Sequence, residues 1–68
     1  MNELIFLVEV APEGGWTARC LSESIFTEAD SMDEMRTNIR EAVRCHFDGD
    51  ATPKVLRLHI VSEEMLVA

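Results

Sequence analysis

The sequence has no tyrosine and only two cysteines, and its one lysine and five arginines are outnumbered by 13 acidic residues. Cys20 and Cys45 are too few for a disulfide framework and do not form a Cys-x-x-Cys pair. We therefore expect both to be small buried thiols. A Cys20–Cys45 disulfide is the alternative for a protein from a hyperthermophile.

Long apolar runs and basic clusters are also missing. The longest apolar run covers Leu4 to Val8, which is far below the ~20 residues that span a bilayer. The acidic start Met1-Asn2-Glu3 has no basic region of the kind that opens a secretory signal. So few Lys and Arg argue against DNA binding, because a surface that neutralises many phosphates needs clustered cations. These absences predict a cytoplasmic protein with no membrane segment.

The composition is that of a small globular domain. The chain has 68 residues, of which 47% are hydrophobic and 28% charged, and a formal net charge of −7. We expect one domain, 1–68, with an ordered core of about 3–62 and an apolar tail, 63–68. A domain of this size buries only about 60% of the surface of its unfolded chain. Association with further copies, as a dimer or higher homo-oligomer, is therefore expected.

Period-two patterns predict strands over 3–10, 16–21, 25–29 and 54–61. The first two strands form a hairpin around Pro12 and Gly14-Gly15. In the first strand Leu4, Phe6, Val8 and Val10 share one face. Ile5 and Leu7 lie on the other face and need a cover that a two-layer domain does not supply.

A helix is predicted after Ser31, which suits the N-cap position and forms a capping box with Glu34. Gly49 is expected to end this helix in a left-handed conformation. Five helix residues share one stripe that should face the sheet: Met35, Ile39, Ala42, Val43 and His46.

The fold class is therefore α+β, a two-layer β-β-β-α-β domain with an antiparallel-type sheet and one helix packed on one face. The face of the last strand that carries Leu56, Leu58 and Ile60 is expected to meet the helix. His46 is expected to be a core histidine with one hydrogen bond.

No set of residues predicts catalysis, a metal site or a cofactor. The only candidate ligand group is Cys45, His46, Asp48 and His59, and its spacing lacks the paired ligands of structural zinc sites. Cys45 lies near the end of the helix, where the dipole disfavours a thiolate nucleophile. The acidic residues are expected to form a solvated rim. We therefore expect that the protein is not an enzyme.

Partner surfaces are better indicated. Arg36, Arg40 and Arg44 recur every four residues along the helix and form either a solvated ridge or an anchor for an acidic partner. The apolar residues of the uncovered sheet face and of the tail favour self-association by sheet packing or edge pairing. The predicted contact residues are Ile5, Leu7, Arg36, Arg40, Arg44, Val55, Arg57, Val61, Met65 and Leu66.

Three segments, in this order, resemble the HicB family of antitoxin-like proteins. They are Gly14-Gly15-Trp16-Thr17-Ala18-Arg19-Cys20, Ile25-Phe26-Thr27-Glu28-Ala29-Asp30-Ser31 and Glu34-Met35-Arg36-Thr37-Asn38-Ile39-Arg40-Glu41-Ala42-Val43. The resemblance covers about residues 4–62, and the family fold agrees with the β-β-β-α-β order.

The resemblance implies a protein that binds a small basic ribonuclease toxin of HicA type and blocks its RNA-binding or catalytic surface. A net charge of −7 suits such a partner. Two features depart from the family. The chain ends at Ala68 without a DNA-binding segment, so we expect no operator binding, and Leu21-Ser22-Glu23-Ser24 replaces a Pro- and Gly-containing segment. The alternative is an oligomeric scaffold or regulator with no toxin partner.

Overall fold

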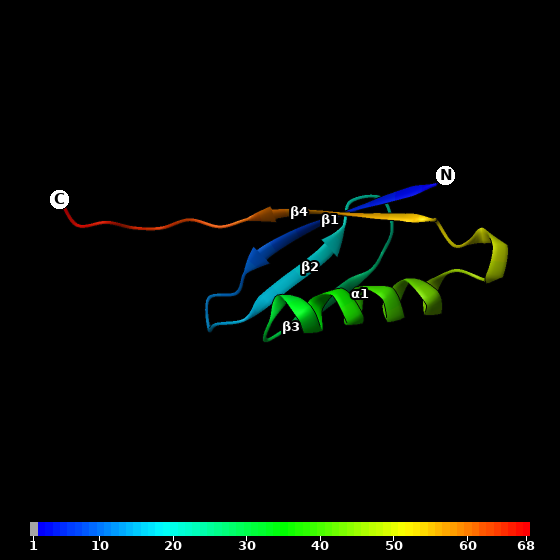
Figure 1. Cartoon of the computed structure of the whole chain (residues 1–68), viewed down its shortest axis with the longest axis horizontal. Helices are drawn as coiled ribbons and strands as arrows, with labels where there is room; N and C mark the ends of the chain where they lie inside the picture. The colour runs from blue at the N-terminus through cyan, green and yellow to red at the C-terminus, as the bar shows by residue number, and fades with distance from the viewer. Residues whose placement is uncertain (1) are drawn as a thin grey trace.

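The computed structural model describes residues 2–68, so Met1, where the predicted domain and the acidic start begin, lies outside the described residues. Four strands, one α-helix and one short 3-10 helix follow one another along the chain (Figure 1). Their bounds are β1 Glu3–Val10, β2 Trp16–Cys20, β3 Phe26–Ala29, α1 Met32–His46, η1 Gly49–Ala51 and β4 Val55–Val61.

One sheet contains all four strands, in the order β3-β2-β1-β4. The strands β1, β2 and β3 form an antiparallel meander. The strand β4 reaches the far side of β1 through α1 and pairs parallel to β1, which makes the sheet mixed. A helical crossover returns the chain to the same end of the sheet, so the strand after it runs parallel. The predicted α+β fold with one helix on one face is confirmed. The expected antiparallel-type sheet is corrected to a mixed sheet, because β4 runs parallel to β1.

The core lies between the sheet and α1. From β1 it takes Leu4, Phe6 and Val8, none of which is exposed. The period of two in this strand places these side chains on the face that the helix covers. The other buried apolar residues are Ala18, Cys20, Ile25, Ala29, Met35, Ile39 and Val43.

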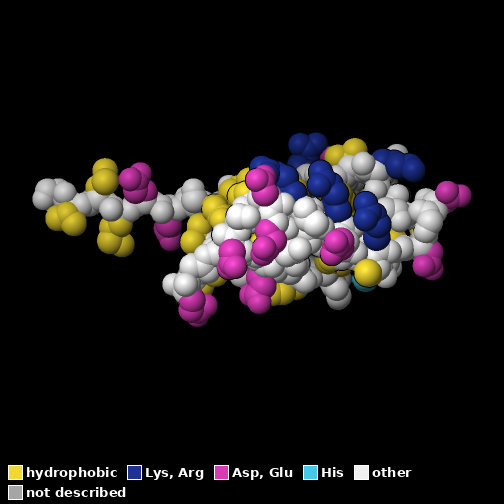
Figure 2. Space-filling model, turned by 60° about the horizontal axis from the view of Figure 1, so that its bottom comes forward, with side chains coloured by type: hydrophobic (Ala, Val, Ile, Leu, Met, Phe, Trp, Pro, Cys, Tyr) yellow, Lys and Arg dark blue, Asp and Glu magenta, His cyan; other side chains and the backbone are white. Residues whose placement is uncertain are grey.

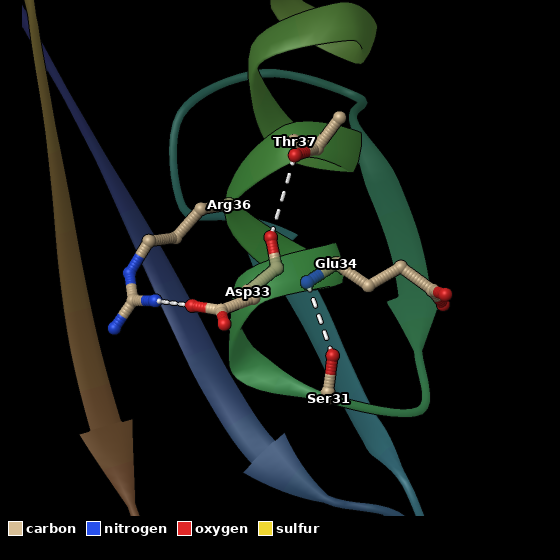
Figure 3. A network of polar contacts seen from close by, with 5 residues as sticks. All are labelled: Ser31, Asp33, Glu34, Arg36 and Thr37. Atoms are coloured by element: carbon tan, nitrogen blue, oxygen red, sulfur yellow. Dashed lines mark hydrogen bonds and ion pairs between the residues drawn. The ribbon is translucent and has the colours of Figure 1, made fainter.

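The first turn of α1 is closed by side chains (Figure 3). Ser31 Oγ accepts a hydrogen bond from the Glu34 N–H at 3.1 Å, as predicted for an N-cap. The carboxylate of Glu34 accepts from the N–H of Asp30, also at 3.1 Å. In a capping box the Glu34 carboxylate would accept from the N–H of the N-cap residue Ser31, whereas here it accepts from the N–H of Asp30. The two hydrogen bonds still satisfy two N–H groups at the start of the helix.

The end of α1 differs from the prediction in two ways. The helix ends at His46, and Phe47 closes it in an extended conformation through its N–H to the Val43 carbonyl. Gly49 does have a positive φ of 42°, but it begins the short 3-10 helix instead of capping α1. The prediction that His46 is a core residue is wrong, because its exposed ring lies 3.1 Å from Glu23 Oε1 at the domain edge.

The helix covers β2 and β3 more closely than β4. The expected contact of the last strand is made in part, because Leu56 and Leu58 pack against the core and Ile60 does not. Leu56 and Leu58 are only half-buried, and Ile60 is 50% exposed. The loop through η1 carries the chain past β2 and β1 before β4 begins. A single helix is too narrow to cover four strands, so the helix-side face of β4 stays partly open.

The hairpin between β1 and β2 depends on two glycines with positive φ, Gly14 at 103° and Gly15 at 77°. A Cβ on Gly15 would lie 2.8 Å from the carbonyl oxygen of Ala29, whereas a Cβ on Gly14 would meet nothing within 4 Å. We expect Gly15→Ala to lower the free energy of unfolding by about 2 kcal/mol and Gly14→Ala by about 1 kcal/mol. Urea denaturation measures both, and equal losses would contradict the predicted clash.

Candidate functional site

The ten predicted contact residues fall on three separate surfaces. Ile5, Leu7, Val55, Arg57 and Val61 lie on the face of the sheet opposite α1, which we call the open face. Arg36, Arg40 and Arg44 lie on α1, and Met65 and Leu66 lie in the segment after β4. The structure therefore does not bring these residues together into one site.

The open face mixes apolar and charged residues in rows across the strands. One row runs through Phe26, Arg19, Leu7 and His59, which are register neighbours on β3, β2, β1 and β4. Phe26 is 63% exposed and was not predicted as a contact residue. Phe26 and Glu28 are two residues apart on β3, so their side chains lie on the same face of the sheet. This alternation is the sequence signal that places Phe26 on the open face. No described element covers these side chains, so they are accessible to a partner.

Glu3 and Arg57 form a two-bond ion pair on the open face. Arg57 Nη2 donates to Glu3 Oε2 at 2.9 Å, and Arg57 Nε donates to Glu3 Oε1 at 3.2 Å. These hydrogen bonds hold the pKa of the Glu3 carboxyl below its ordinary value and raise the pKa of the Arg57 guanidinium. The pair joins β1 to β4, the two parallel strands.

Replacing Arg57 with methionine should raise the pKa of Glu3 toward its ordinary value, because the hydrogen bonds to the carboxylate are lost. In the unmodified chain the lowered pKa stabilises the fold above the pKa of an unfolded carboxyl. This stabilisation disappears as the pH falls through the folded pKa. A carboxyl ¹³C NMR titration measures the shift. Arg19→Met is the control, and an equal shift in both variants would contradict the assignment.

A groove of about 330 Å³ separates α1 from β4. We call it the α1–β4 groove, and its lining residues are Met32, Arg36, Ile39, Arg40, Leu56, Leu58 and Ile60. Its floor is apolar, and guanidinium groups stand on its helix side. Arg36 also pairs with Asp33 at 2.6 Å within the first turns of α1 (Figure 3). The groove therefore suits an apolar segment that carries negative charge.

The segment 62–68 continues beyond β4 in an extended line away from the rest of the domain (Figure 1). Its apolar residues Met65, Leu66 and Val67 are 93%, 82% and 97% exposed. Three neighbouring apolar side chains without cover are costly in water. This segment is the most exposed apolar part of the described chain.

Four acidic residues gather at one end of the sheet, where the β1–β2 turn meets the start of α1. A hollow of about 210 Å³ there contains the half-buried Trp16 and the carboxylates Glu13, Glu28, Asp30 and Glu34. Figure 2 shows most acidic side chains below and to the left of the cluster of Lys and Arg side chains. From the sequence these acidic residues were expected only to form a solvated rim, because their position around Trp16 depends on which ends of the strands lie together.

The residues considered for metal binding or nucleophilic chemistry lie apart. Cys45 and His46 are at the end of α1, Asp48 is in the loop that follows, and His59 is on the open face. Within residues 2–68 no three His, Cys, Asp or Glu side chains are grouped to hold a metal ion. Both cysteines are free thiols. Cys20 is buried as predicted, whereas Cys45 is exposed and lines a hollow beside Ile25 and Phe26, so the prediction of a buried thiol is wrong there.

The part of the chain that the structure describes has no helix that is long and apolar enough to cross a bilayer.

Comparison with known proteins finds two curated relatives, each named UPF0150 protein. One, from Archaeoglobus fulgidus, is 46% identical over 55 residues, which cover 81% of this chain and 82% of the relative. The other, from Thermotoga maritima, is 33% identical over 62 residues, which cover 91% of this chain and 87% of the relative. No profile of a known protein family and no solved structure matches the chain. Because both alignments span most of each protein, the chain belongs to the UPF0150 family.

Proposed function

We propose that this protein is a HicB-type antitoxin that acts in the cytoplasm. It binds a small basic ribonuclease toxin of HicA type and covers the RNA-binding or catalytic surface of that toxin. The action is steric and electrostatic occlusion, which requires a binding surface and no catalytic residue. The three sequence segments that resemble the HicB family support this proposal.

The observation that carries the proposal is the charge of the molecule. The formal net charge is −7, with 13 acidic against six basic residues. Carboxylates are concentrated around Trp16, and the arginines of α1 lie elsewhere on the surface. Opposite fields accelerate the encounter of two proteins and favour a basic partner over an acidic one.

Copurification with a small basic HicA-like ribonuclease encoded next to this protein tests the proposal. We expect a complex at micromolar concentrations and loss of the ribonuclease activity in stoichiometric mixtures. The association rate should fall by tenfold or more when salt is raised from about 0.05 to 0.5 M, because the steering field is screened. Absence of binding at micromolar concentration, or a complex that still cleaves RNA, would refute the proposal.

The alternative function, an oligomeric scaffold or regulator with no toxin partner, has its own supporting observation. The open face carries Ile5, Leu7 and Phe26 without cover, and such a face can join copies of one chain as well as a foreign protein. A genome neighbourhood without any small basic protein would favour this alternative.

A further inference from the structure

We propose that two copies of this chain join through their β4 edges, and that the segment 62–68 of each copy forms a strand along β4 of the other. The two strands run antiparallel, with Val61 of one copy opposite Val61 of the second copy. The result is one continuous sheet made from both four-stranded sheets, with both helices on the same side. This proposal goes beyond the binding of a toxin and does not depend on it.

The first argument is the free edge of β4. In the described sheet β4 has a neighbour only on its β1 side. The strand has seven residues with neither Gly nor Pro, so no proline or glycine interrupts backbone pairing along this edge. The N–H of Val55 donates to the Asn2 carbonyl at 2.9 Å, on the β1 side. Alternate residues of a strand direct their backbone groups to opposite sides, so those of Leu56, Leu58 and Ile60 point outward.

The second argument is the course of the segment 62–68. It leaves β4 in line with the strand and extends away from the rest of the domain in Figure 1. Only its first residues, Ser62 and Glu63, line a hollow beside the end of β1. A return into the α1–β4 groove of its own copy would need a tight reversal directly after Val61. Of the residues that usually form turns, the sequence Ser62-Glu63-Glu64-Met65-Leu66-Val67-Ala68 contains only Ser62, and it has no Gly, Pro, Asn or Asp. A second copy offers the same groove without any reversal.

The third argument is the match of side chains in this register. On the helix side Leu66 lies opposite Leu56, and on the open face Val67 lies opposite Val55. These are the apolar cross-strand pairs that stabilise antiparallel sheets. The backbone N–H and C=O groups of Leu56, Leu58 and Ile60 point out from the edge. In this register they lie opposite Leu66, Glu64 and Ser62 of the second copy, and backbone hydrogen bonds form at each of these pairs. Two apolar residues of the segment, Leu66 and Val67, are then covered by apolar residues of β4, and Met65 lies beside the aliphatic stem of Arg57.

Charge supports the same register. Glu64 lies opposite Leu58, on the floor of the α1–β4 groove, where Arg36 and Arg40 line the helix side. Glu63 lies opposite His59 on the open face. If the segment is shifted by two residues along β4 in one direction, the carboxylates of Glu63 and Glu64 lie opposite the apolar side chains of Val61 and Ile60. A shift in the other direction leaves Leu66 opposite Lys54, so only the proposed register forms both apolar pairs.

A pair of proline variants tests the hydrogen bonding. The N–H of residue 64 points to the partner copy in the proposed dimer, whereas the N–H of residue 63 points away from it. Light scattering after size exclusion should give twice 7.7 kDa for the unmodified chain and for Glu63→Pro, and 7.7 kDa for Glu64→Pro. Neither residue lies in a described helix or strand, so the circular dichroism of the monomeric variant should stay unchanged. A monomeric unmodified chain, or equal effects of both prolines, would overturn the proposal.

Cysteine cross-linking tests the register. In a Cys45→Ser background, Val61→Cys places two thiols opposite each other at a non-hydrogen-bonded pair, where Cα atoms are about 4.5 Å apart. That spacing fits a disulfide. Ser62→Cys is the matched control, because two residues 62 lie beyond the ~7 Å limit for bridging. With oxidised glutathione as oxidant, we expect at least tenfold more covalent dimer from Val61→Cys than from Ser62→Cys. Equal yields would overturn the register.

Failure of these experiments is distinguishable from failure of the proposed function. A monomer that still inhibits a basic ribonuclease would refute the strand-paired dimer and leave the antitoxin proposal intact. A cross-linked dimer that binds no ribonuclease would refute the antitoxin proposal and leave the strand-paired dimer intact.

Discussion

Replacing Phe6 with alanine should lower the free energy of unfolding by about 3–5 kcal/mol. Phe6 is fully buried at the centre of β1, between its register neighbours Cys20 on β2 and Leu58 on β4. The lost contacts and the cavity left under α1 both contribute to the cost. A single small core supplies about 3–5 kcal/mol in total, so most Phe6→Ala molecules should be unfolded at 25 °C.

Phe26→Ala is the matched control, because the same atoms are removed from a side chain that is 63% exposed on the open face. Its effect on the unfolding of the monomer should stay below about 1 kcal/mol. Urea denaturation followed by the fluorescence of Trp16, the one tryptophan, measures both variants. Similar losses in the two variants would show that Phe6 does not carry the core.

The local elements were predictable because each depends on neighbours in the sequence. The alternation of Leu4, Phe6 and Val8 predicts β1 with the bounds that the structure shows. Ser31 and Glu34 predict the start of α1 for the same reason, since a cap involves residues three apart. The predicted fold class followed from the order of these elements.

The arrangement of elements was less predictable, because it depends on contacts between distant segments. The spacing of Leu56, Leu58 and Ile60 shows that they share a face, but it does not show whether α1 lies above β4 or above β2 and β3. For the same reason His46, which continues the apolar stripe in sequence, lies at the domain edge beside Glu23. Phe47, the next residue, packs against the core instead.

The candidate surfaces were likewise predictable where they depend on neighbouring residues and not where they depend on distant segments. Alternation in β1 placed Ile5 and Leu7 correctly on the face opposite the helix. The groove and the acidic hollow required the tertiary structure, because each combines segments from distant parts of the chain. Glu13 and Glu28 are fifteen residues apart, and the antiparallel pairing of β1, β2 and β3 brings them to one end of the sheet.

We call the end of the sheet where Glu13, Glu28, Asp30 and Glu34 lie together the acidic end. It is a candidate contact surface for the proposed basic toxin. If the acidic end binds the basic toxin, reversing two of its charges should weaken the complex by about 100-fold or more, which is ~2.7 kcal/mol. Glu13→Lys with Glu28→Lys makes this change at two exposed side chains, neither of which makes an ion pair within residues 2–68. The cost arises because each new ammonium group faces a cationic surface.

Asp48→Lys with Asp50→Lys is the control at the other end of α1. Both double variants replace two carboxylates with two lysines, so the net charge changes equally. Asp48 and Asp50 are exposed, and Asp48 makes no side-chain cap to the short 3-10 helix, so the control should stay folded. Isothermal titration of the same toxin at one salt concentration compares the two double variants. A loss that is confined to Glu13 and Glu28 assigns the contact to the acidic end. Equal losses would mean that the net charge alone attracts the partner, because long-range steering depends on the total charge and specific contacts depend on its position.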